Sequence, residues 1–150
     1  PHLATGLAKG GRSREDFTYS PSITVSIAAN DSPEALAEAR RAARTTIAFY
    51  GTVKTYDPIW EMHGFQAPIN QVRRAFIRND HAAMLDAVTE EMVDVFTIAG
   101  TKDTVVERLA ELRELGDVLW VGGPTYYLPP AQIAEYRQRL FGLVAALSGK

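Results

Sequence analysis

The segment GGPTYY, which opens with Gly122 and Gly123 and ends with Tyr126 and Tyr127, is the part of the chain best suited to bind a ligand. Adjacent glycines let backbone amides approach a bound molecule, because no side chain stands in the way. The two tyrosines would add flat ring surfaces and hydroxyl groups. The segment follows Val118–Val121, four apolar residues that predict a strand buried on both faces. Since α/β folds form their sites at the carboxyl ends of parallel strands, we expect a binding loop here, with a simple tight turn as the alternative.

An alternating segment nearer the N-terminus predicts another strand. β-Branched residues alternate with small polar ones from Ile23 to Ala29. Ser32 is suited to cap a helix, and the proline that follows it fits the first helical position. We therefore expect a helix from Pro33 to about Tyr50, with Ala29 and Asn30 in the loop that joins the strand to it.

Most of the remaining chain has helical periodicity. Thr52 to Gln66 is irregular and aromatic, and its Trp60 would either cover the mouth of a pocket or pack among helices. Two helices are predicted after it, from Pro68 to Arg78 and from His81 to Phe96. A further helix begins after Thr101, which can cap it.

The order of these elements predicts an α/β domain with a parallel sheet. Strand and helix alternate, with a brief extended piece at Phe96–Ala99. Gly116 is expected to end the helix before Val118–Val121 in the left-handed conformation. Only two strands are convincing, at Ile23–Ala29 and Val118–Val121. Such a sheet leaves strand edges open and helix faces uncovered, so the domain is expected to be incomplete.

Composition narrows the classes of function. The 150 residues fit one domain, here the single partial domain 1–150. A formal net charge of −2 argues against nucleic acid as the main partner, and no apolar run reaches the length of a membrane span. The absence of cysteine fits a cytoplasmic protein. Because His2, His63 and His81 lie far apart in the sequence, we expect no metal site.

Several segments together resemble bacterial-luciferase-like flavin and deazaflavin oxidoreductases. They are GLAKGGRSREDF with Gly11-Arg12, the helix that ends in Phe49-Tyr50-Gly51, EEMVDVFTIAGTKDTVVERLAEL with Ala99-Gly100-Thr101, and GDVLWVGGP. The most similar branch is the coenzyme F(420)-dependent, methylene-tetrahydromethanopterin-reductase-like group. The resemblance covers nearly the whole chain.

This resemblance implies a (β/α)₈ TIM barrel of which the chain is the C-terminal part. Ile23–Ala29 would be strand seven and Val118–Val121 strand eight. The implied cofactor is coenzyme F(420) or FMN. The residues implied to line the mouth of the barrel are Ala29, Asn30, Gly122 and Gly123 for the cofactor, and Trp60, Tyr126 and Tyr127 for the substrate pocket. Catalytic residues stay unassigned, because most contacts with the cofactor ring come from earlier strands in this family.

Three hypotheses of function follow. The first is the C-terminal portion of an oxidoreductase or monooxygenase that passes hydride between its cofactor and a small organic molecule, with the N-terminal half of the barrel as its partner. The second is a catalytically inactive fragment that folds by association with another copy of itself. The third is a small helical binding module without catalytic ancestry. On the first hypothesis, the chain by itself is expected to be inactive.

Overall fold

Three parallel strands form one sheet in the computed structural model, which describes residues 2–113 and 115–148. β1 (Ser22–Ile27) lies in the middle, between β2 (Thr97–Gly100) and β3 (Trp120–Gly122). Thr24 of β1 is paired with β2 on one side and with β3 on the other. The predicted helix-rich α/β class with a parallel sheet is therefore confirmed. The brief extended piece is a true strand, so the described sheet has three strands rather than two.

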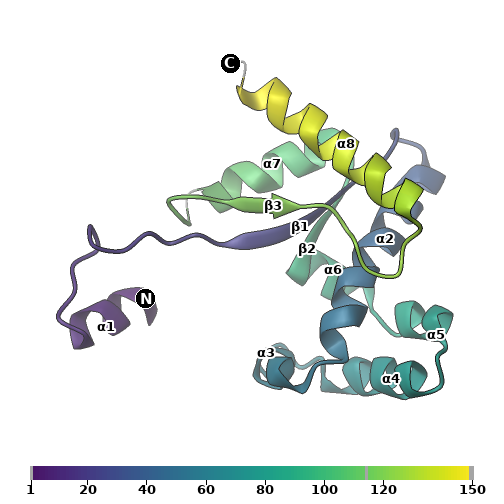
Figure 1. Ribbon diagram of the computed structural model, residues 1–150, viewed down its shortest axis with the longest axis horizontal. Coiled ribbons are helices and arrows are strands. Elements are labelled where there is room, and N and C mark those ends of the chain that lie inside the picture. Colours follow the sequence, from purple (N-terminus) through teal and green to yellow (C-terminus); the bar gives the residue numbers. More distant parts are fainter. Residues whose placement is uncertain (1, 114, 149–150) are drawn as a thin grey trace.

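Helices cover both faces of this sheet (Figure 1). α2 (Pro33–Gly51) and α6 (Glu90–Phe96) lie on one face, where the Ser26 hydroxyl donates a hydrogen bond of 2.7 Å to the Ala39 carbonyl. α7 (Lys102–Arg113) and α8 (Pro130–Ser148) lie on the other face. Side chains alternate along a strand, so Ser26 faces one helical layer and its neighbours face the other. The result is three layers.

The layer of α7 and α8 buries the apolar side chains of the strands. The cluster between sheet and helices consists of Val25, Ile27, Ile98, Val105, Leu140 and Leu143. Burying each such side chain contributes about 1.5–3 kcal/mol relative to leaving it exposed. This small cluster holds the C-terminal helices on the sheet.

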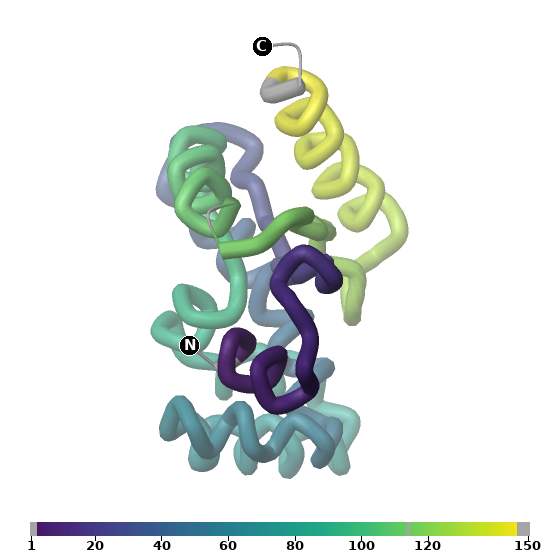
Figure 2. The backbone as a smooth tube through the Cα atoms, turned by 90° about the vertical axis from the view of Figure 1, so that its left-hand side faces the viewer, coloured from purple at the N-terminus to yellow at the C-terminus, as the bar shows by residue number. Residues whose placement is uncertain are grey.

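A larger core lies away from the sheet, among the helices between β1 and β2. It is formed by the C-terminal half of α2, by α6, and by four elements between them: η1 (Lys54–Tyr56), α3 (Asp57–Met62), α4 (Gln66–Ile77) and α5 (His81–Asp86). Figure 2 shows α4 at the opposite end of the molecule from α8. The buried residues of this core include Ile47, Trp60, Phe65, Ile69, Val72, Met84, Val88 and Met92. The inserted helices therefore have a core of their own.

The N-terminal helix α1 (His2–Lys9) stands apart from the layers, at the end of an extended segment (Figure 1). That segment is tied to the start of β3. Arg14 donates two hydrogen bonds of 2.8 and 2.7 Å to the Asp117 carboxylate, which also accepts one of 2.7 Å from the Tyr19 amide. Residues about 100 positions apart are thus joined beside the sheet.

Local signals in the sequence place several helix ends correctly. Ser32 accepts a hydrogen bond from the Ala35 amide, and Asp80 accepts one from the Ala83 amide. Thr101 accepts one from the Thr104 amide at the start of α7. Each side chain thus satisfies an amide that the helix itself leaves free.

The long helix expected from His81 to Phe96 is wrong, because the chain interrupts it between α5 and α6. Thr89 begins a second helix there by accepting a hydrogen bond of 3.2 Å from the Met92 amide. With the break, the side chains of Met84, Val88 and Met92 all pack in the same core. The segment expected to be irregular before α4 likewise contains η1 and α3.

Two expectations about the last strand are also wrong. β3 is an edge strand instead of one buried on both faces, and its Trp120 is 66% exposed. Gly116 is absent from the positions with positive φ in the described chain. A Cβ at Gly116 would lie 2.5 Å from Cδ of Pro21, so this glycine allows two segments to approach closely.

Candidate functional site

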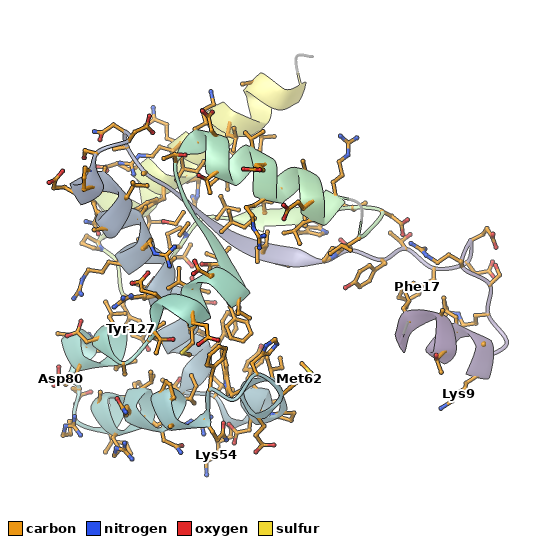
Figure 3. All side chains as sticks on the ribbon, turned by 180° about the vertical axis from the view of Figure 1, so that it is seen from behind. Lys9, Phe17, Lys54, Met62, Asp80 and Tyr127 are labelled. Carbon is orange, nitrogen blue, oxygen red and sulfur yellow. The ribbon has the colours of Figure 1, made fainter. Side chains whose placement is uncertain are left out.

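The glycine–tyrosine loop after β3 folds back onto α2. The Tyr126 ring stacks on the Phe49 ring with centroids 3.7 Å apart and an angle of 5° between the planes. The Tyr127 ring lies 4.9 Å from the imidazole of His81, at the start of α5. Figure 3 shows Tyr127 on the same side of the inserted helices as Asp80, while Met62 lies on the other side. The loop is therefore held by aromatic contacts with residues from two other elements.

The glycines of this loop have open backbone surroundings. A Cβ at Gly122 would meet no atom within 4 Å, and one at Gly123 would make only ordinary contacts with Tyr136 and its neighbour. Neither glycine has a positive φ. In this loop Tyr127 has a positive φ of 54°. Residues other than glycine rarely adopt this backbone conformation. The backbone constraint thus falls on a tyrosine.

Two phenols of the loop region have raised pKa values. Hydrogen bonding with Tyr126, followed by burial, raises the pKa of Tyr50, and burial raises the pKa of Tyr127. These groups are therefore neutral hydrogen-bonding groups at ordinary pH.

A cavity of about 200 Å³ lies beside Tyr127, between α2 and α8. Glu38 and Arg41 of α2 line it together with Tyr136 of α8, whose hydroxyl donates a hydrogen bond of 3.4 Å to the Glu38 carbonyl. Burial and the nearby Glu38 raise the pKa of Tyr136. Among the predicted site residues, Tyr127 is the one that lines this cavity.

Ala29 and Asn30 lie elsewhere. They follow the end of β1 and are exposed, and the Asn30 side chain accepts a hydrogen bond of 2.9 Å from the Ser32 amide. Gly122 pairs at the level of Thr24, three residues before the end of β1, which corresponds to about 10 Å along the strand. The described arrangement therefore does not bring the predicted cofactor residues into one cavity.

Trp60 lies in the inserted helices and lines a different cavity, of about 320 Å³. Its side chain is 4% exposed and meets Phe96 edge to face at 5.0 Å. The indole N–H has no hydrogen-bond partner in the described part of the chain. Hydroxyl and aromatic side chains make up most of the remaining lining: Ser22, Thr24, Thr46, Tyr50, Tyr56 and Phe96. Tyr126 does not line this cavity, but Tyr50, which meets the Tyr126 ring edge to face at 5.8 Å, does.

Other kinds of site find no support in the part of the chain that the structure describes. It contains no group of three or more His, Asp or Glu side chains placed to hold a metal ion. Across residues 2–113 and 115–148, no helix combines the length and apolar character needed to cross a bilayer. The cavities beside Tyr127 and Trp60 are not lined by Ala29, Asn30, Gly122 or Gly123.

Comparison with known proteins identifies the family of this chain. A family model for luciferase-like monooxygenases matches residues 1–118. The chain belongs to this family. The chain is 36% identical over 129 residues to a 5,10-methylenetetrahydromethanopterin reductase from Archaeoglobus fulgidus, and 29% identical over 123 residues to one from Methanolobus tindarius.

These alignments cover most of this chain but only part of each relative. Each alignment takes in 81% of the chain but only 36% of the relative. The solved structure of the coenzyme F420-dependent tetrahydromethanopterin reductase from Methanopyrus kandleri superposes with a TM-score of 0.61 at 28% identity, over 79% of the chain and 33% of that structure. The chain therefore spans about a third of the length of the relatives it matches, and its fold corresponds to part of theirs.

Sequence reasoning missed the residues that surround the loop. Phe49, His81, Glu38 and Arg41 contact Tyr126 or Tyr127 or line the cavity beside them. Phe49 had a usable signal, because it lies in the aromatic pair that ends α2. The others carry no local signal, since their role depends on the loop after β3 reaching them.

Proposed function

We propose that the chain forms the C-terminal part of a luciferase-like oxidoreductase that uses coenzyme F420 and passes hydride between the cofactor and a small organic substrate. The supporting observation is the agreement between the number of strand–helix pairs and the share of the relative's length that the chain covers. The described chain contains three strand–helix pairs, β1–α2, β2–α7 and β3–α8. A barrel of this kind has eight. Three of eight agrees with the 36% of the Archaeoglobus fulgidus reductase that the chain covers.

The strand numbers proposed here differ from those expected from the sequence, in which Ile23–Ala29 was strand seven and Val118–Val121 strand eight. With β2 counted, the three pairs would be the last three of the barrel, and β1, β2 and β3 would be strands six, seven and eight. The partner is the portion of the barrel that precedes these strands in the longer relatives. Coenzyme F420 is favoured over FMN because the reductase of known structure that the chain resembles depends on it.

The proposed site residues would act by position rather than by proton transfer. In a closed barrel, Ala29, Asn30, Gly122 and Gly123 would follow strand ends at one rim and offer backbone amides to the cofactor. Tyr126 and Tyr127 would contact the substrate, and Trp60 is retained as a more distant member of that pocket. Hydride chemistry would be supplied by the cofactor, and this chain would contribute binding surface and orientation.

The experiment that tests this function is cofactor binding measured by fluorescence quenching of coenzyme F420. The chain alone is expected to bind weakly or not at all. The chain joined to the N-terminal portion of the Archaeoglobus fulgidus reductase is expected to bind, with FMN titrated in parallel as a competing ligand. No binding by the joined protein would overturn the proposal.

Self-association is the second candidate, in which the chain is an inactive fragment that pairs with another copy. The outer edges of β2 and β3 have no strand beside them in the described sheet, and Trp120 and Phe141 are largely exposed. Open edges and apolar surface favour pairing between chains. Light scattering decides the matter: a dimer or larger species supports this candidate, and a monomer at high concentration removes it.

A further inference from the structure

The strands are not arranged in the order that a barrel requires. In a (β/α)₈ barrel each strand pairs with the next strand along the chain. In the described sheet β1 separates β3 from β2. β3 therefore occupies the edge of β1 that, in a barrel, would be paired with the strand preceding β1. This places the last strand of the chain in the position of a missing neighbour.

The helices differ from a barrel in a corresponding way. Crossovers between parallel strands are right-handed, so the direction of the step across the sheet decides which face the helix covers. The steps from β1 to β2 and from β2 to β3 run in opposite directions, and α2 and α7 accordingly lie on opposite faces. If β3 lay beyond β2, both helices would lie on one face, as the outer ring of a barrel requires.

Within the segment that would have to move, β3 is only lightly held, although α8 buries Tyr136, Leu140 and Leu143. We call residues 102–148 the C-terminal arm. Val105 is the one buried residue of the described part of α7, and β3 pairs with β1 over three residues. Trp120, Phe141 and Leu115 are each about two-thirds exposed. A short pairing with exposed side chains means a low free energy of local opening for β3.

Polar contacts at the start of β3 retain the arm at this edge. The Trp120 amide donates a hydrogen bond of 2.9 Å to the Pro21 carbonyl, and the Asp117 amide donates one of 2.9 Å to the Tyr19 carbonyl. The carboxylate of Asp117 binds Arg14 in addition. β3 itself is thus attached by a small exposed clamp, whereas α8 of the same arm packs on the sheet through the buried Leu140 and Leu143.

We propose that the edge of β1 at residues 21–24 is the docking site for the strand that precedes β1 in the longer relatives, and that the C-terminal arm covers this edge until that strand binds. The partner is a parallel β-strand from the N-terminal portion of the barrel. It takes the hydrogen-bonding groups of β1 that β3 now uses, and β3 then pairs with the free edge of β2. This inference rests on the proposed function, because it assumes that the chain completes a barrel.

Hydrogen exchange of the chain by itself tests whether the arm is detachable. The Trp120 amide bonds between β3 and β1, and the Ala28 amide donates a hydrogen bond of 2.8 Å to the Gly100 carbonyl between β1 and β2. The Trp120 amide is expected to exchange at least about tenfold faster than the Ala28 amide. Equal protection of the two amides would overturn the inference. Asp117→Asn should speed exchange at Trp120 and leave Ala28 unchanged. The matched control Glu111→Gln removes an ion pair with Arg108 on the same arm and should change neither rate.

A cross-link tests which strand occupies the edge. The chain has no cysteine, so the pair Ser22→Cys and Trp120→Cys, which are register partners, forms a disulfide only while β3 lies beside β1. Oxidation of the chain alone should give mostly cross-linked product. Joined to the N-terminal portion of the Archaeoglobus fulgidus reductase, the same variant should give little.

The two results separate this inference from the proposed function. A joined protein that unfolds cooperatively, binds coenzyme F420 and still cross-links fully would overturn the inference while supporting the function. A joined protein that fails to bind the cofactor would count against the function. In that case the exchange rates of Trp120 and Ala28 in the unjoined chain still decide whether the arm is detachable.

Discussion

Glu90 joins α6 to α2 through two arginines, and neutralising it should destabilise the chain in a pH-dependent way. Its carboxylate accepts hydrogen bonds from Arg40 and Arg44, and Arg40 also lies 2.8 Å from Asp94. The side chain of Glu90 is 55% exposed, whereas that of Arg44 is 19% exposed. We therefore treat both pairs as partly screened by solvent, each contributing about 0.2–1 kcal/mol.

Glu90→Gln keeps the shape of the side chain and removes its charge. The two weakened pairs together should lower the free energy of unfolding by about 1 kcal/mol at pH 7. For a chain of this size that corresponds to a fall of about 2–4 °C in the midpoint of thermal unfolding. Circular dichroism at 222 nm measures that midpoint, and high salt should reduce the difference.

The pH dependence follows from the pKa of Glu90. Burial raises this pKa, but hydrogen bonds and attraction from Arg40 and Arg44 lower it by more, so it lies below its ordinary value of 4.5. A carboxyl whose pKa is lower in the folded state stabilises fully above the unfolded-state pKa and loses that contribution as pH falls through the folded-state value. The difference between wild type and Glu90→Gln should therefore shrink below pH 4.5.

The neighbouring Glu91 supplies the control. It lies on the same turn of α6, is exposed, and makes no ion pair within the part of the chain that the structure describes. Glu91→Gln should leave the midpoint nearly unchanged at every pH. Equal midpoints for the two variants at pH 7, or a Glu90→Gln difference that does not shrink as the pH falls below 4.5, would refute the assigned role of the arginine pairs.

Three further predictions test the core, the sheet and the loop. Met84→Ala should lower the free energy of unfolding, measured in urea, by about 2–5 kcal/mol because it leaves a cavity in the inserted helices. The control Met62→Ala, at an exposed position, should change it by less than about 0.5 kcal/mol. Similar losses for the two variants would contradict the described core. Ser26→Ala should cost about 0.5–1.5 kcal/mol by removing the buried hydrogen bond to the Ala39 carbonyl, and no loss would show that the bond adds nothing to stability. Tyr126→Phe should retain the stack on Phe49 but lower the pKa of Tyr50, measured by absorbance at 295 nm, while an unchanged titration would remove the Tyr50–Tyr126 hydrogen bond as the cause.

The features that the sequence predicted well are those that depend on neighbours along the chain. A cap such as Ser32 or Thr101 acts on an amide three residues away, so its residue type and position are sufficient. The strand at Ile23–Ala29 was likewise predicted within two residues of β1. Thr89 carried the same kind of signal, and weighing it would have shown the break before α6.

The features that were missed depend on distant segments. Val118–Val121 is apolar enough for a buried strand, but burial depends on what lies on either side, and β3 has a neighbour only at β1. Gly116 was predicted to end a helix, yet its lack of a side chain instead allows close contact with Pro21, nearly a hundred residues earlier. The contact of Tyr126 with Phe49 is of the same kind. Pairing of this sort cannot be deduced from local residue types.

The inference that the arm covers an edge of β1 gives the exposed apolar surface and the unusual strand order one common explanation. A strand that will later lie inside a barrel must be apolar, and until it is covered it needs a substitute neighbour. On that inference β3 and α8 would provide the substitute in this chain, in which Trp120 and Phe141 are exposed. The family match ends at residue 118, immediately before β3, so the segment with the substitute role is also the one outside the shared pattern. An arm that only substitutes should be the least stable part of the sheet, and the core of the inserted helices should unfold independently of whether the arm is attached.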